Sequence, residues 1–176
     1  MQIIWDYIMR FFTLVLFGIL GLAVVASPAQ AADSTVVKRF QDWTVYKAET
    51  NDGVLCFAAS TPKDIKPKNV RRGDIFFYIT SWPKHKVSQE VSVKLGYPLK
   101  SSTTPTITIG SSNFTLFEKG ERAYIHSSLE DGLLKAMRAG DKMMIKAVSK
   151  RGTSTTDIYS LSGVTAALKA VVKACK

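Results

Sequence analysis

Few residues of this 176-residue chain have the type and spacing that chemistry requires, and the two cysteines are the clearest of them. Neither Cys56 nor Cys175 has a second cysteine or a histidine at the spacing of zinc ligands, so we expect no metal site. In an oxidising compartment an even pair of cysteines predicts one disulfide, which would join Cys56 to Cys175. The alternative is two buried free thiols.

Candidates for catalysis are scarce. His85 lies between two lysines in a predicted turn and His126 ends a predicted strand, so we expect both on the surface. The nucleophile-elbow, zinc-protease and phosphate-loop motifs do not occur in the sequence. No spacing assigns the nearby acidic residues to an acid–base pair: Glu118, Glu121, Glu130 and Asp131. We therefore expect a non-enzymatic protein without a cofactor. The alternative is a hydrolase that acts on an envelope polymer through a carboxylate pair.

Basic side chains are the best functional candidates. The chain has 24 Lys and Arg against 14 Asp and Glu, a formal net charge of +10 at pH 7. Such a charge attracts phospholipid head groups, lipopolysaccharide phosphates and acidic glycans. The candidate anion-binding residues form two groups, one in the polar loop 61–74 and one along the predicted strand 141–151: Lys63, Lys66, Lys68, Arg71 and Arg72, and then Lys142, Lys146 and Lys150. The alternative for both groups is a solvated surface that binds nothing.

The first 31 residues have the pattern of a secretory signal peptide. Arg10 precedes a charge-free run over 11–26, and Ala29-Gln30-Ala31 supplies the small-x-small cleavage pattern. The run is shorter than the about 20 residues of a membrane-spanning helix, so we expect cleavage after Ala31 rather than a retained anchor. The mature domain, 32–176, would then be periplasmic, envelope-associated or secreted. Nucleic acid is not an expected partner there, and the sequence predicts no oligomeric state.

The elements that must position these residues are mainly strands. Turn signals, among them Asp52-Gly53, separate short segments typical of strands, which we place at 36–48, 54–59, 75–82, 91–95, 106–109, 113–117, 122–126, 141–151 and 155–161. Two amphipathic segments predict a helix near 129–139, capped by Ser128, and a C-terminal helix near 163–175. The expected fold is mainly β, an antiparallel β-sandwich or barrel-like domain with these two helices.

Two expectations follow from this placement. The apolar face of the C-terminal helix includes Cys175 and so turns it toward the core, where the strand residue Cys56 could meet it. Trp43, Tyr78 and Trp82 fall within strands, and we expect them in the core rather than on a sugar-stacking platform.

Several short segments occur in a characteristic order along the mature chain. They are Asp42-Trp43-Thr44-Val45, the stretches 55–60, 76–83, 90–98 and 106–110, then Arg151-Gly152-Thr153 and the stretch 156–163 before the last helix. In this order, and over nearly all of the mature chain, they resemble the invasion-associated locus B family of exported bacterial proteins.

The resemblance implies a periplasmic or envelope-associated, non-enzymatic, β-rich domain, and it brings no catalytic residues. Many members have a cysteine shortly after the Asp-Trp strand, whereas Tyr46 and Lys47 occupy that region here, which favours pairing of Cys56 with Cys175. The family name implies a link to host-cell invasion in some pathogens. We expect an exported protein that binds an envelope or host-surface macromolecule, or that associates peripherally with an anionic membrane surface or lipopolysaccharide.

Overall fold

The structure is a computed structural model that describes residues 33–176, so the predicted signal peptide and its cleavage site lie outside the described residues. The strands are β1 (Ser34–Phe40), β2 (Trp43–Thr50), β3 (Gly53–Ser60), β4 (Asp64–Lys66), β5 (Phe76–Trp82), β6 (Val87–Lys94), β7 (Thr106–Ile109), β8 (Ser112–Lys119), β9 (Arg122–Ile125), β10 (Lys142–Val148) and β11 (Ser154–Ser160). The helices are a 3₁₀ turn, η1 (Pro83–His85), and the α-helices α2 (Ser127–Ala139) and α3 (Val164–Ala174).

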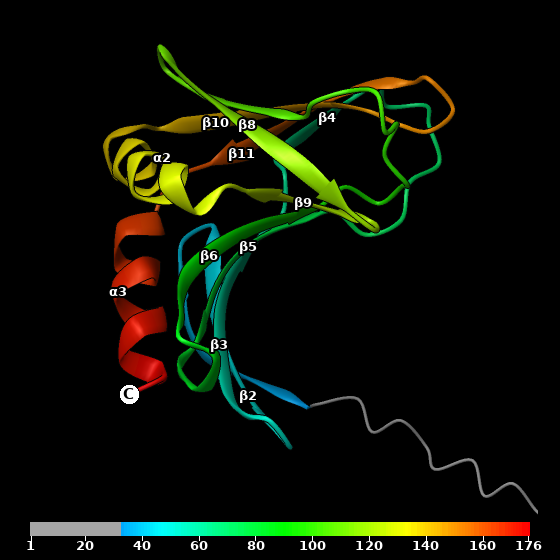
Figure 1. The fold of residues 1–176 in the computed structure, drawn as a ribbon. Helices are drawn as coiled ribbons and strands as arrows, with labels where there is room; N and C mark the ends of the chain where they lie inside the picture. The colour runs from blue at the N-terminus through cyan, green and yellow to red at the C-terminus, as the bar shows by residue number, and fades with distance from the viewer. Residues whose placement is uncertain (1–32) are drawn as a thin grey trace, which may run out of the picture. The chain divides into compact units, whose positions relative to one another are not determined.

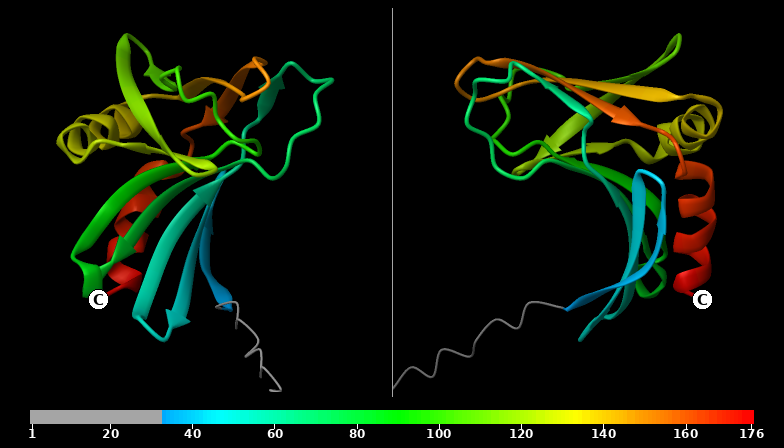
Figure 2. Two further views of the ribbon diagram at one scale, coloured as in Figure 1. Left: turned by 45° about the vertical axis from the view of Figure 1, so that its right-hand side comes forward. Right: turned by 180° about the vertical axis from the view of Figure 1, so that it is seen from behind.

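All eleven strands belong to one antiparallel sheet in the order β1-β2-β3-β5-β6-β9-β8-β7-β10-β11-β4. Strand β8 pairs with β9 on one side and with β7 on the other, and so joins a lower half that begins at β1 to an upper half that ends at β4. The upper half folds over the lower one, and α3 runs along one face of the lower half (Figures 1 and 2). The predicted mainly β fold with two helices is confirmed.

Side-chain alternation decides which side of the sheet is buried. On β5, Phe77 and Ile79 are fully buried, with the ring of Phe77 against Tyr159 of β11, while their neighbours Phe76 and Tyr78 lie on the opposite side and are partly exposed. The apolar stripe of α3 packs into the same core, and Leu168 is only 1% exposed. One side of the sheet is therefore covered by helices, and the other is not covered by any element among residues 33–176.

Three local predictions are wrong. The segment 36–48 is two strands, because the chain reverses at Gln41 and Asp42 without a glycine or proline to signal the turn; Gln41 takes a left-handed φ of 54°. Helix α2 begins at Ser127 with His126 as its N-cap residue, so Ser128 is not the cap. The polar loop 61–74 contains an edge strand, β4, that pairs with β11.

The disulfide Cys56–Cys175 is present and joins β3 to the end of α3, with 5.7 Å between the two Cα atoms. Cys56 is fully buried, and the bond closes a loop with a sequence separation of 119. It therefore fastens the last helix to a central strand of the lower half.

We expect loss of this bond to lower the free energy of unfolding by about 4–5 kcal/mol, because a long covalent loop restricts the unfolded chain. Denaturant unfolding of the C56A/C175A double variant measures the difference. The double variant should also be insensitive to reductant, which serves as the control. Two alkylatable thiols in the native, oxidised protein would contradict the assignment.

Candidate functional site

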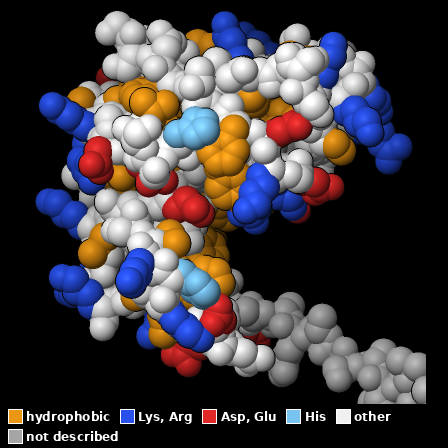
Figure 3. Space-filling model, in the orientation of Figure 1, with side chains coloured by type: hydrophobic (Ala, Val, Ile, Leu, Met, Phe, Trp, Pro, Cys, Tyr) orange, Lys and Arg blue, Asp and Glu red, His pale blue; other side chains and the backbone are white. Residues whose placement is uncertain are grey.

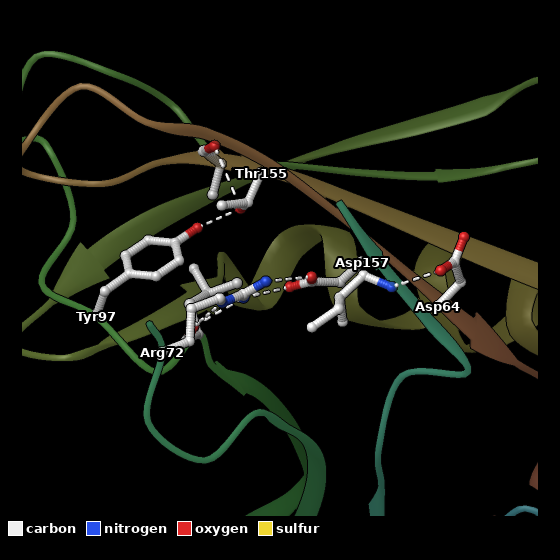
Figure 4. A network of polar contacts seen from close by, with 8 residues as sticks. Asp64, Arg72, Tyr97, Thr155 and Asp157 are labelled. Carbon is white, nitrogen blue, oxygen red and sulfur yellow. Dashed lines mark hydrogen bonds and ion pairs between the residues drawn. The ribbon is translucent and has the colours of Figure 1, made fainter. Parts of the chain in front are cut away.

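Some basic residues of the predicted loop form ion pairs within the described residues, and others do not. Arg72 is wrong as a surface anion-binding residue, because its side chain is 4% exposed and forms an ion pair with the fully buried Asp157. Arg72 Nη1 and Nη2 donate to the two carboxylate oxygens of Asp157 at 2.6 and 2.7 Å (Figure 4). Arg72 Nε and Nη2 also donate to the carbonyl oxygen of Leu95 at 3.1 and 2.8 Å, so all three nitrogens of the guanidinium are used within the fold.

The surroundings of Arg72 hold it in place. Burial opposes the charge of the guanidinium, but the hydrogen bonds and the charge of Asp157 outweigh burial and raise the pKa of Arg72. The ring of Tyr97 lies 4.9 Å from the guanidinium carbon. The backbone beside Arg72 is fixed where the amide of Gly73 donates to the carbonyl of Gly96 at 2.8 Å. Gly96 has a φ of +74°, and a side chain there would overlap the carbonyl oxygen of Gly73.

Two further lysines of the loop are paired with carboxylates. Lys63 forms an ion pair with Asp42, and its hydrogen bond lowers the pKa of that carboxyl group. Lys68 lies 3.8 Å from Asp64. Both lysines line a hollow of about 480 Å³ between the loop and β4, and Asp64 lines it as well. The hollow therefore contains both positive and negative charge. Within residues 33–176, Lys66 and Arg71 are the members of the predicted loop group that are exposed and form no ion pair.

Lys142 and Lys146 of the strand group are arranged as predicted, whereas the prediction that Lys150 shares their strand face is wrong because β10 ends before it. On β10, Met143, Ile145 and Ala147 are buried, while Lys142 and Lys146 are exposed on the other side of the strand. Lys150 is exposed in the turn that follows. Neither Lys142, Lys146 nor Lys150 forms an ion pair within the described part of the chain.

The pairing of β10, β11 and β4 places Lys66 of the loop beside the lysines of β10. Lys146 lies opposite Thr156 on β11, and Thr156 lies opposite Lys66 on β4, so the two lysines flank one threonine on the same side of the upper half. They are separated by two strand spacings, about 10 Å. We call Lys66, Lys142 and Lys146 the lysine face.

A second candidate surface lies on the uncovered side of the lower half. Tyr46 of β2 stacks on Phe57 of β3 with ring centroids 5.0 Å apart, and Phe57 makes an edge contact with Tyr78 of β5 at 5.9 Å. Farther along, Tyr124 of β9 stacks on Phe117 of β8 at 6.0 Å, and Phe117 is 38% exposed. An uncovered sheet face is ordinarily polar, so five aromatic rings on one such face indicate a contact surface.

Basic residues border these rings. Lys94 of β6 lies opposite Arg122 of β9, and Arg122 lies opposite Lys119 of β8, which places three positive charges in one row. The guanidinium of Arg122 lies 4.9 Å from the ring centre of Tyr78. Figure 3 shows a hollow beneath the overhanging upper part, with hydrophobic side chains along its inner wall and Lys or Arg at its upper edge. We call this surface, with its aromatic rings and its basic row, the open face.

The open face was not predicted. Tyr78 was expected in the core and is half-buried on the open face instead, whereas Trp43 is fully buried as expected. Trp82 is half-buried, and its indole N–H donates to the carbonyl oxygen of Asp52 at 3.0 Å. The available signal was that Tyr46, Phe57 and Tyr78 occupy the strand positions that alternate with the buried ones.

A third feature is a hollow of about 470 Å³ where α2 begins, and it is lined by two carboxylates, Glu90 and Glu130. Burial raises the pKa of Glu130, and the charges of Glu90 and Asp131 add to that effect, while the backbone amide of Val91 opposes it. His126, which is exposed as predicted, also lines this hollow, and His85 is exposed in η1.

The described residues contain no group of three His, Cys, Asp or Glu side chains placed to hold a metal ion. Within 33–176 there is also no helix long and apolar enough to cross a bilayer. The fold is therefore that of a disulfide-linked, mainly β domain. Its helices lie on one side of the sheet, and the two candidate contact surfaces lie on the other side.

Comparison with known families is consistent with that class. The chain belongs to the family described as Invasion associated locus B (IalB) protein, whose model matches residues 43–172. The match covers β2 to the last turns of α3 and therefore includes the open face, the lysine face and the buried Arg72–Asp157 pair. A comparison with curated proteins finds no match.

We expect R72M to lower the free energy of unfolding by about 3–5 kcal/mol, because it leaves the carboxylate of Asp157 buried without a partner. The double variant R72M/D157L should recover most of that loss, since neither charge is then buried alone. R71M is the matched control and should change stability by less than about 0.5 kcal/mol, because Arg71 is exposed. Denaturant unfolding measures all three, and equal losses for R72M and R71M would contradict the structure.

Proposed function

We propose that the chain is an exported, non-enzymatic envelope protein that binds an anionic envelope component, such as lipopolysaccharide or an anionic membrane surface, through the lysine face. Export is supported by the signal-peptide pattern of the first 31 residues and by the disulfide, a bond typical of oxidising compartments. Attachment of this kind is compatible with a role in host-cell invasion, the process that gives the family its name.

The observation that carries the proposal is the distribution of the positive charge. Three carboxylates neutralise Lys63, Lys68 and Arg72, whereas Lys66, Lys142 and Lys146 lie on one side of the upper half without an ion pair among residues 33–176. Their strand neighbours on that side include Thr106 and Thr156, whose hydroxyl groups can donate hydrogen bonds to phosphate oxygens. A cationic, threonine-rich surface suits an anionic partner.

The proposal predicts that the triple variant K66Q/K142Q/K146Q binds purified lipopolysaccharide and anionic vesicles about 100-fold more weakly than the unmodified protein. Each lysine near an anionic surface contributes about 1 kcal/mol, and the three together therefore correspond to about that factor. Binding is measured by co-sedimentation at several salt concentrations and should be strongest at low ionic strength.

The matched control is K135Q/K169Q/K173Q, which removes the same charge from exposed positions on α2 and α3. It should bind nearly as well as the unmodified protein. Equal weakening of both triple variants would show that net charge alone is responsible and would contradict the lysine face. Absence of binding at low ionic strength would contradict the proposed function itself.

A second candidate function is a hydrolase that acts on an envelope polymer, and one observation favours it. Glu90 and Glu130 line the same hollow, and the raised pKa of Glu130 is a property of carboxyl groups that donate a proton in catalysis. The hollow also contains His126 and Ser127, which can bind a polar substrate.

The hydrolase proposal predicts that the purified protein releases soluble fragments from peptidoglycan or from isolated envelope polysaccharide. E130Q should lower that rate by a factor of about 100 or more, because a general acid contributes at least that much. E118Q, at an exposed position outside the hollow, is the control. No fragment release by the unmodified protein would exclude this candidate.

A further inference from the structure

We propose that the open face is a binding site for an acidic glycan, a chain of pyranose rings that bear carboxylate or sulfate groups. The rings of the glycan would stack on the aromatic side chains, and its acidic groups would meet the basic row. This site lies on the lower half of the sheet and does not depend on the lysine face, so either one can exist without the other.

Three like charges stand beside one another on the open face. Lys94, Arg122 and Lys119 lie directly opposite one another on three adjacent strands, an arrangement that repels in the absence of an anion. Asp74 lies 3.7 Å from Lys94 and neutralises one of the three. Arg122 and Lys119 form no ion pair within the described residues, so a net positive charge remains in the row.

A row of aromatic rings lies next to the basic row. Tyr78, Ser92, Tyr124 and Phe117 lie opposite one another on β5, β6, β9 and β8, one pleat away from the basic row. Tyr78 and Tyr124 are separated by two strand spacings, about 10 Å, which is comparable to the length of a disaccharide. The small Ser92 lies between them and is itself buried. Aromatic planes offer apolar contact to the C–H faces of sugar rings while the tyrosine hydroxyls accept or donate hydrogen bonds.

The shape and the chemistry of the open face favour an acidic glycan over a bilayer or a peptide. The open face is hollowed (Figure 3), so a planar bilayer would touch its rim and not its rings. An extended peptide adds to a sheet through free backbone groups, and the backbone at Tyr78, Ser92 and Tyr124 is already paired with a strand on both sides. Single-stranded nucleic acid also combines stacking rings with negative charge, and it is therefore the alternative that the experiment must separate.

The experiment is calorimetric titration of the purified protein with hexasaccharides of galacturonate, hyaluronan and heparin. We expect at least one of the three to bind at low ionic strength, and a neutral maltohexaose to bind about tenfold more weakly or not at all. R122Q and Y78L should each weaken binding about tenfold or more, because they remove a charged contact and a stacking ring. K119Q, at an exposed hairpin position, tests the basic row without disturbing buried groups and should also weaken binding.

The control is K169Q, at an exposed position on α3 away from both candidate surfaces, which should leave glycan affinity within about twofold. Thermal unfolding of each variant separates lost binding from lost structure, and K119Q keeps the test valid if R122Q or Y78L is unfolded. Failure of all three acidic hexasaccharides to bind would overturn the proposal, as would equal binding by K119Q and the unmodified protein. Tighter binding of a thymidine hexanucleotide that depends on Arg122 would overturn the choice of occupant.

Discussion

The buried ion pair between Arg72 and Asp157 connects the two halves of the sheet, and each of its charges is tolerated only while the other is present. Arg72 stands in the segment that leads into β5 of the lower half, Asp157 is on β11 of the upper half, and the carbonyl of Leu95 that Arg72 also binds follows β6. One guanidinium thus joins the two halves at the point where the sheet folds over. A charge buried this deeply is tolerated only when it is paired, and here all three guanidinium nitrogens donate to an acceptor, Nε and Nη2 to Leu95 and Nη1 and Nη2 to Asp157.

With the halves joined, the two sides of the sheet take different roles. The side that carries Phe77, Ile79 and Ile145 is closed by α2 and α3, and the disulfide fastens α3 to β3. The other side continues without a break from one half to the other, because Thr115, Phe117 and Lys119 alternate along the shared strand β8 and face the same way. The lysine face and the open face therefore belong to one uncovered surface.

The sequence predicted what depends on local pattern. Helical periodicity placed α3 and turned Cys175 inward, and strand alternation on β10 separated Met143 and Ile145 from Lys142 and Lys146. It could not predict which loop cations find partners, since Arg72 and Asp157 are far apart along the chain and meet only through the fold of the sheet. Tyr78 was misplaced for a related reason: an apolar ring in a strand suits the core, but no element among residues 33–176 covers its side of β5.

The central claim is that contacts with the envelope are made on the uncovered side of the sheet, away from α2 and α3. Hydroxyl-radical footprinting of the protein, with and without isolated envelope fragments, tests this directly because exposed aromatic and aliphatic side chains on both sides react. The account predicts protection of Phe117, Tyr124 and Met144 on the uncovered side, with unchanged oxidation of Leu129 and Val172 on the helical side. Protection confined to the helical side, or equal protection of both, would contradict it.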